Sequence, residues 1–425
     1  MYSRFLESAY GQALQYRKRR DRQFEIWWNG SLQTKGTRDS VSNLSFQKCV
    51  RKMMEDMGRK GPYKGPLFLE LQFHPPEKNA PSIQNLAKHY LDLLMSPIQG
   101  LSLNRKKLLL QDDSQIRFLS CNYAPMIFEE GIRLRVHRLS DFFADLRLYR
   151  DLRSGDFGDR VKDKEDEDDL FEEDQIDSWL DFQRDRTDWK ERLGEEAFAS
   201  YELMMQRFAQ EQALKQRKIP LRALGGLFGT KHNAFGHHPT MKDILLANAS
   251  LSRFAYFHDL TAVDLGARPL ITGDSDRFKA RVREGLAAYK KRIPLFSPLL
   301  VTVGVTIIYV PPVKAPKVDL DNLARKAIIP AVHEILEPPS SSIVGLRRLK
   351  IKHPDGDDID QFIERLKKMP PVQVAGYDIL CAERLPDDPP NGSVKLFLHA
   401  GDAMRSTLTH LKDVLDEWER DVERD

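Results

Sequence analysis

The stretch LVTVGVTIIYVPPVKAPKVDLDNLARKAII, residues 300–329, combines an apolar run, two prolines, two aspartates and a helical pattern. The apolar run is long and rich in β-branched residues, which is typical of a buried strand. After the prolines, apolar residues return at helical spacing from Leu323 to Ile335. The stretch therefore predicts a strand, a short loop and an amphipathic helix.

A second stretch, FLELQFHPPEKNAPSIQNLAKHYLDLL at residues 68–94, has the same organisation. Each stretch contains an apolar strand, Pro-Pro, a short basic linker, and then Asn-Leu-Ala and a cation at the start of a helix. Helical segments precede the two stretches, and strand-like segments lie around them. The helical segments are residues 43–58 and 275–292, and the strand candidates are residues 23–32, 114–123, 131–139, 254–265, 342–353 and 392–400. We infer two copies of one α+β unit.

This repeat divides the chain into five expected segments. They are an N-terminal helix at residues 1–22, a first unit at 23–140, an acidic linker and helical insertion at 141–255, a second unit at 256–402 and a C-terminal helix at 403–425.

The net charge of +3 conceals an uneven distribution along the chain. Residues 162–174 contain nine acidic and two basic side chains, so the remainder is more basic than the total indicates. A basic surface is typical of nucleic-acid binders, although other proteins have one too. The acidic segment is either a solvated linker or a cover for a basic groove. This segment and the amphipathic C-terminal helix are also candidate contacts for a protein partner, and the alternative for the C-terminal helix is a contact with the N-terminal helix.

The sequence also limits the cellular setting. No apolar run has the length of a membrane span, and the N-terminus lacks a secretory apolar segment. The three cysteines are isolated, which predicts neither a disulfide framework nor a zinc knuckle. We expect a soluble, cytoplasmic protein that does not enter the membrane.

Asp319 and Asp321 are separated by one residue, after the predicted strand. On an extended backbone their side chains point to the same side, where two like charges repel unless a cation lies between them. A hard divalent cation such as Mg²⁺ prefers such oxygen ligands. The alternative is that Asp321 caps the helix while Asp319 is solvated.

The pattern Asp-x-Asp-Asn-Leu, a cation one turn along the helix, and a later Asp-Asp-Ser-Gln before a strand resemble the RusA family of Holliday junction resolvases. Members of that family are small homodimeric, Mg²⁺-dependent endonucleases that cut branched DNA. The resemblance implies an α+β pseudo-dimer of two RusA-like units, each a small mixed sheet packed with helices. It also implies branched or duplex DNA as the partner and Mg²⁺, or Mn²⁺, as the cofactor.

The second unit keeps the first acidic motif of that family. It has Asp319 and Asp321, with Arg325 at the usual lysine position and Lys326 beside it. Where an Asp-Asp pair should follow, it has PSSSI at residues 339–343.

The first unit keeps the complementary part. Ser82 and Gln84 replace the two aspartates of the first acidic motif. The retained polar residues are Lys88, Asp92, Asp112 and Asp113. In the family, both motifs belong to the site of one subunit, so each unit here is expected to be incomplete unless the units exchange elements.

Two functions remain open at this level. One is an active nuclease, and the other is a degenerate relative that binds DNA without cutting, as a subunit of a phage, plasmid or defence assembly. A protein without a role on DNA is a third possibility, since fold does not fix function. For the active enzyme, the expected metal ligands are Asp319, Asp321, Asp112 and Asp113. The expected catalytic residues are these four with Lys88, Arg325 and Lys326.

Basic residues near both motifs are expected to contact DNA phosphates. They are Lys314, Lys317, Arg105, Lys106 and Lys107.

Overall fold

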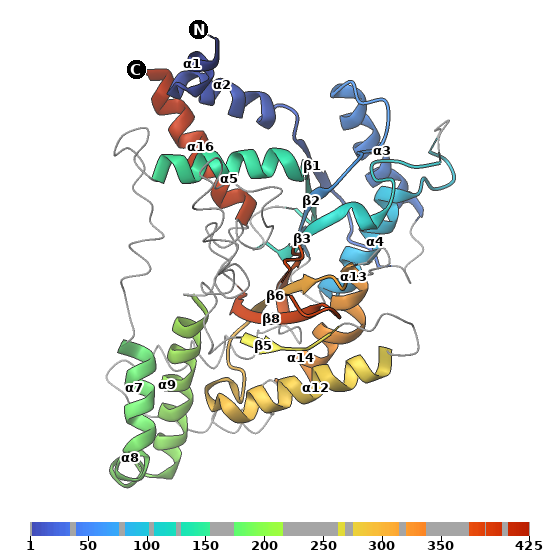
Figure 1. The fold of residues 1–425 in the computed structure, drawn as a ribbon. Coiled ribbons are helices and arrows are strands. Elements are labelled where there is room, and N and C mark those ends of the chain that lie inside the picture. The colour runs from blue at the N-terminus through green and yellow to red at the C-terminus, as the bar shows by residue number, and fades with distance from the viewer. Residues whose placement is uncertain are drawn as a thin grey trace.

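The protein has a mixed α+β fold around one sheet, as a computed structural model shows (Figure 1). The structure describes residues 2–34, 40–75, 81–101, 106–124, 129–153, 174–215, 262–267, 275–313, 320–336, 374–386, 388–401 and 407–424. Within these ranges, no helix is both long enough and apolar enough to span a bilayer.

The described strands form an eight-stranded mixed sheet in the order β1-β4-β2-β3-β7-β6-β8-β5. The strands are β1 (Phe24–Asn29), β2 (Leu67–His74), β3 (Ile116–Tyr123), β4 (Gly131–Arg138), β5 (Ala262–Asp264), β6 (Val303–Val310), β7 (Val374–Cys381) and β8 (Ser393–Ala400). The apolar run at the head of residues 300–329 is confirmed as β6, which is buried along its whole length.

The two halves of the sheet repeat one pattern of pairing. β2 is parallel to β3 and antiparallel to β4, and β6 is likewise parallel to β7 and antiparallel to β8. Both parallel pairs carry a register irregularity at the same place, between Leu67 and Phe68 and between Val303 and Gly304. The halves join through antiparallel pairing of β3 with β7, where Ser120 faces Asp378. The internal repeat expected from the sequence is thus present in the strand order and register.

This antiparallel junction decides which ends of the two halves meet. Because β6 is parallel to β7, it runs opposite to β3. The C-terminal end of β6 therefore lies at the same end of the sheet as the N-terminal end of β3. The start of the helix after β6 is brought toward the first half in this way.

Helices cover both faces of the sheet (Figure 1). One face carries α3 (Ser40–Asp56), α4 (Ile83–Met95), α12 (Ser275–Arg292), α13 (Leu320–Leu323), the π-helical turn η4 (Ala324–Ile328) and α14 (Ile329–Ile335). The other face carries α2 (Ala9–Arg20), which follows the short α1 (Tyr2–Glu7), with α5 (Leu139–Arg153) and α16 (Thr407–Arg424). The helices predicted before and after both strands, and at both termini, are confirmed.

A helical hairpin occupies part of the segment between the two halves. It consists of α7 (Asp174–Arg184), α8 (Arg186–Leu193) and α9 (Glu195–Lys215). The end of α9 is fixed to the turn η3 (Pro294–Phe296), since the side-chain amides of Gln206 and Gln210 both donate to the Leu295 carbonyl. The acidic residues 162–173 lie outside the described residues.

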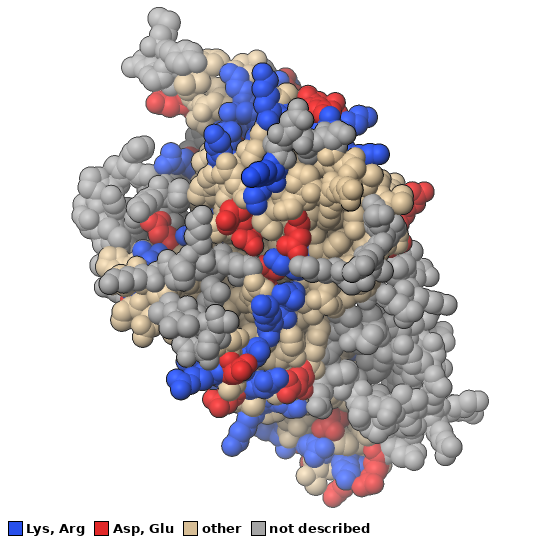
Figure 2. All heavy atoms as spheres, turned by 90° about the vertical axis from the view of Figure 1, so that its right-hand side faces the viewer, with Lys and Arg blue, Asp and Glu red and all other residues tan. Residues whose placement is uncertain are grey.

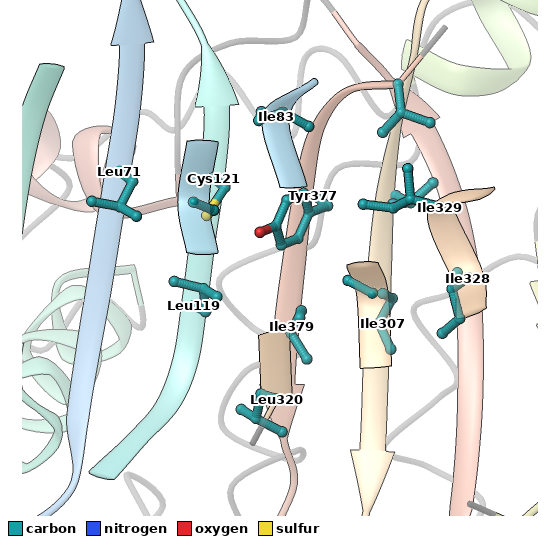
Figure 3. Close-up of a cluster of buried hydrophobic side chains, with 14 of the residues drawn as sticks. Leu71, Ile83, Leu119, Cys121, Ile307, Leu320, Ile328, Ile329, Tyr377 and Ile379 are labelled. Carbon is teal, nitrogen blue, oxygen red and sulfur yellow. The ribbon is translucent and has the colours of Figure 1, made fainter. Parts of the chain in front are cut away.

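In the core beneath α4 and α13, corresponding residues of the two halves pack against the same strand. Ile83 begins α4 and Leu320 begins α13, and the two are equivalent in the repeat. Figure 3 shows Ile83 over Tyr377 and Leu320 beside Ile379, at different points along β7. All four are almost fully buried. The two helix starts therefore pack against the same central strand, at different points along it.

One strand of the second half was not predicted from the sequence. The segment proposed as a strand, residues 342–353, lies outside the described residues. In the position equivalent to β3, the sheet contains β7 instead. Its sequence, VAGYDILC, has Gly376 and Asp378 in its interior, and both residue types are depleted in strands. These residues obscured the strand pattern.

Candidate active site

Polar side chains from both halves of the chain meet beside the α4 and α13 helices. The Lys88 ammonium lies 3.3 Å from an Asp92 carboxylate oxygen, 3.9 Å from Asp113 and 3.6 Å from Asp321. Lys88 and Asp92 lie on α4, and Asp113 lies just before β3. Asp321 comes from the other half, at the start of α13. We call these four residues the composite site.

Asp321 is the most buried member of the composite site. It is 3% exposed, and neither carboxylate oxygen accepts a hydrogen bond from the described residues. A buried carboxylate without hydrogen bonds is costly, so it is normally paired or binds a cation. Lys88 supplies charge compensation at 3.6 Å but no close hydrogen bond. Asp321 therefore retains its capacity to bind another positive group, and it does not behave as the helix cap that was the alternative prediction.

The Asp-Asp-Ser-Gln motif divides its two aspartates between two roles. The Asp112 carboxylate accepts from the Ser114 backbone N–H at 2.8 Å and caps the 3₁₀ turn η1 (Asp113–Gln115). The Gln115 side chain completes a capping box by accepting from the Asp112 backbone N–H. This turn directs Asp113 to Lys88. Asp112 thus has a capping role that the sequence analysis did not predict, while the expected metal-ligand role of both aspartates stays a prediction.

The cation that pairs with Asp321 comes from the other half of the chain. Arg325 donates to the Asn322 side chain at 2.8 Å, and Lys326 is exposed. Neither forms a described ion pair with Asp321, whereas Lys88 of the other half does. The physical reason is that the antiparallel junction sets the start of α13 against α4, so that the nearest ammonium comes from the neighbouring helix.

The π-helical turn η4 has a local cause. Pro330 has no backbone N–H and its ring clashes with the carbonyl four residues earlier, which prevents a regular helix at this point. The Ile329 N–H instead reaches the Ala324 carbonyl, five residues back. Such turns recur at functional sites because they redirect nearby side chains. Here the turn contains Arg325 and Lys326, close after Asp321.

The remaining predicted residues are placed only in part. Lys106 and Lys107 are exposed, in the segment that leads to Asp112. Four residues lie outside the described part of the chain: Asp319, Lys314, Lys317 and Arg105.

Two features of the site were missed by sequence reasoning. Asp92 was seen as a retained residue but was given no role, although its spacing of four residues from Lys88 is the usual one for an ion pair along a helix. The contacts that join both halves were not identified either, although an exchange of elements between the units was left open. Its signal was the complementary loss itself, since each unit lacks what the other keeps.

The surface around the site shows a mixed charge pattern. Figure 2 views the face that carries α3, α4 and α12, and acidic side chains gather near its middle, with lysine and arginine side chains above and below. A nucleic-acid backbone requires cations for affinity, whereas carboxylates close to phosphate are tolerated where they bind a metal ion. Cations and carboxylates thus lie on the same face of the described structure.

The chemistry of the composite site suits a hard divalent cation. Its carboxylate oxygens are the ligands that Mg²⁺ prefers, and the buried Asp321 oxygens are without hydrogen bonds. Within the described ranges, however, no three His, Cys, Asp or Glu side chains lie close enough together to hold a metal ion. The Lys88 ammonium lies among the carboxylates. Asp319, two residues before Asp321, does not belong to the described ranges.

No family model matches the chain, no curated protein matches its sequence, and no solved structure matches its fold.

Proposed function

We propose that the chain is a metal-dependent endonuclease for branched DNA, built as a pseudo-dimer of two RusA-like units. The observation that carries this proposal is the shared position of Lys88, which lies within 4 Å of Asp321 from one half and Asp113 from the other. The two incomplete motifs of the sequence thereby contribute to one site. The repeated strand order and register support the pseudo-dimer.

Each residue of the composite site has a role in this proposal. Asp321 and Asp113, with Asp319, hold Mg²⁺ or Mn²⁺ through carboxylate oxygens. When bound, such an ion supplies Lewis-acid stabilisation of the phosphate and lowers the pKa of a bound water. Lys88 offsets the charge of the carboxylates and stabilises the negative charge that develops on the cleaved phosphate.

The DNA contacts of the proposal come from basic residues that lie close in the sequence to the two acidic motifs. Lys106 and Lys107 are exposed and precede the capped turn that carries Asp113. With Arg105, Lys314 and Lys317 they form the proposed phosphate-binding group. Such contacts give affinity for any duplex and orient it over the site without reading its sequence.

The second candidate function is DNA binding without cleavage. One observation favours it, namely that the described residues contain no group of three metal-binding side chains. In this case the Lys88 ion pairs are a structural remnant, and the chain acts as a subunit of a larger assembly.

Cleavage of a labelled four-way DNA junction separates the two functions. We expect the parent protein to cut it with Mg²⁺ and not with excess chelator. Asp321→Asn and Asp113→Asn should each lower the cleavage rate by at least 100-fold, roughly the effect of losing a metal ligand or its close support. Both should bind the junction as tightly as the parent or more tightly, because a negative charge near phosphate is removed.

The matched control is Asp276→Asn, which removes a carboxylate that is 93% exposed on α12. Its cleavage rate should equal that of the parent. Junction binding without Mg²⁺-dependent cleavage by the parent would establish the second function instead. Equal cleavage by Asp321→Asn and the parent would exclude the composite site as the catalytic centre.

A further inference from the structure

The composite site has an equivalent on the other side of the two-fold relation. The repeat aligns Gln84 with Asp321, Arg325 with Lys88, and Ile329 with Asp92. The matching strand registers and the placement of Ile83 and Leu320 in Figure 3 support this alignment. We call Gln84, Arg325 and Ile329 the counterpart position.

The counterpart position has a different chemistry from the composite site. Gln84 is 8% exposed, and its Oε1 accepts no hydrogen bond from the described residues. It has kept the buried location of its equivalent, Asp321, but not the charge. Ile329 is fully buried and provides an apolar side chain where the composite site has Asp92. Arg325 donates to Asn322 on its own helix.

These replacements remove the groups that a metal-dependent reaction requires. Mg²⁺ binds anionic oxygens, and a neutral amide beside an isoleucine offers no carboxylate. The sequence extends the same loss to the other motif positions. Ser82 stands where the repeat has Asp319. Because β7 and not residues 342–353 is equivalent to β3, the expected equivalence of residues 339–343 with the Asp-Asp pair was wrong, and Pro370 and Pro371 stand in the sequence where the first half has Asp112 and Asp113. All the missing carboxylates therefore belong to the counterpart position, and the composite site keeps its own.

We propose that one chain contains a single cutting centre, and that it breaks one strand of a branched DNA in each binding event. This inference rests on the proposed function. In the reaction, the oxygen of water forms a bond to phosphorus while one phosphodiester P–O bond breaks, and the departing oxygen takes up a proton. The product is a nicked junction, whereas two related centres would make paired cuts and separate the junction into duplexes.

A supercoiled plasmid with an extruded cruciform reveals the number of cuts. We expect the protein, shown to be monomeric at the assay concentration by light scattering, to convert the plasmid to nicked circles at least ten times faster than to linear DNA. Gln84→Ala should leave the nicking rate unchanged, whereas Asp113→Asn should abolish it. Linear DNA formed by the monomer without a nicked intermediate would overturn the single centre.

Binding of Mn²⁺ alone, followed by electron paramagnetic resonance, provides a readout that does not depend on cleavage. The parent should bind Mn²⁺, Asp321→Asn and Asp113→Asn should each lose at least 90% of that binding, and Gln84→Ala should retain it. Circular dichroism of each variant verifies folding.

Undiminished binding in both aspartate variants would place the ion elsewhere and overturn the inference. If the parent cleaves no junction and binds no Mn²⁺, the proposed function is wrong as well. If the monomer makes paired cuts, the proposed function holds and only the inference of a single cutting centre is wrong.

Discussion

Lys88 compensates carboxylates that the two halves of the chain bring together. Its ammonium lies within 4 Å of Asp92, Asp113 and Asp321, while only 15% of its side chain is exposed. At an exposed location such pairs contribute little, but removing one partner of a buried pair leaves an uncompensated charge. Asp321 is the critical partner, since its oxygens accept no hydrogen bond from the described residues. Lys88 thus links stability and the proposed chemistry.

Replacing Lys88 tests this link. Lys88→Met should lower the free energy of unfolding by about 2–4 kcal/mol, because it leaves Asp321 buried and unpaired. Addition of Asp321→Asn should recover most of that loss, and a double-mutant cycle in urea measures the coupling. The matched control is Lys326→Met, an exposed lysine on η4, with an expected change of less than about 0.5 kcal/mol. Additive effects of Lys88→Met and Asp321→Asn would contradict the pairing.

A second buried carboxyl lies at the junction of the halves. Burial raises the pKa of Asp378 to about 7, with Glu70 contributing in the same direction and a hydrogen bond with Ser120 opposing it. The raised pKa means that the folded protein holds a proton that the unfolded chain releases near pH 4. Stability should therefore fall as pH rises from about 4 to about 7, and this loss should then remain constant.

Asp378→Asn should remove this pH-dependent loss. We expect the variant to gain stability over the parent progressively between pH 4 and pH 7, to a difference on the order of 2–4 kcal/mol at pH 8. Urea unfolding at several pH values measures the difference. A difference that is constant across this range would show that Asp378 is ionised in the folded protein at every pH tested.

At the scale of elements, α16 joins the two ends of the chain. Its Leu411, Leu415 and Trp418 side chains are buried in a cluster with residues of α2 and α5. The Tyr16 hydroxyl of α2 also donates to the Asp416 carboxylate at 2.7 Å. The expected contact between the C-terminal and N-terminal helices is thus present, and it occupies the apolar face that was a candidate surface for a partner protein.

Truncation of Trp418 tests the contribution of this contact. Trp418 is 3% exposed, so Trp418→Ala should destabilise the protein by about 3–5 kcal/mol through loss of apolar burial and formation of a cavity. Glu417→Ala, which changes an exposed neighbour on the same helix, should cost less than about 0.5 kcal/mol. Thermal and urea unfolding of both variants gives the comparison. Similar losses in the two would show that α16 contributes helix stability alone.

The helices and strands were more predictable from the sequence than the site was. Apolar runs such as the one that became β6 have a period that local sequence displays, and α4 and α12 follow from helical spacing. The pairing of β3 with β7 depends on residues more than 250 positions apart and has no local pattern. The contact of Lys88 with Asp321 follows from that pairing, so local sequence could suggest the residues but not their partners.

At the scale of the whole molecule, the strand pairing repeats in both halves, but the carboxylates of the composite site do not. The strand order and registers repeat, while Asp321 and Asp92 of the composite site have the uncharged equivalents Gln84 and Ile329 in the other half. Backbone pairing and apolar packing are required in both halves for the sheet to form. Buried carboxylates are not required for the sheet to form, and burying charge without compensation costs stability. A repeated fold can therefore retain its architecture while one of two equivalent positions has lost its carboxylates.

The distribution of charge over the whole molecule leads to the last prediction. Because DNA binding by basic side chains releases condensed counterions, affinity for a four-way junction should fall as salt rises, with a slope set by the number of phosphate contacts. Lys106→Ala with Lys107→Ala should reduce the slope of log affinity against log salt concentration by roughly two in magnitude, since each phosphate contact contributes about 0.9.

The control is Arg184→Ala with Lys190→Ala on the helical hairpin, where each cation pairs with a carboxylate. Fluorescence anisotropy with a labelled junction at several salt concentrations, in the presence of chelator to prevent cleavage, measures both slopes. Binding that does not depend on salt would remove the nucleic-acid proposal, and an equal change in both double variants would place the phosphate contacts away from the composite site.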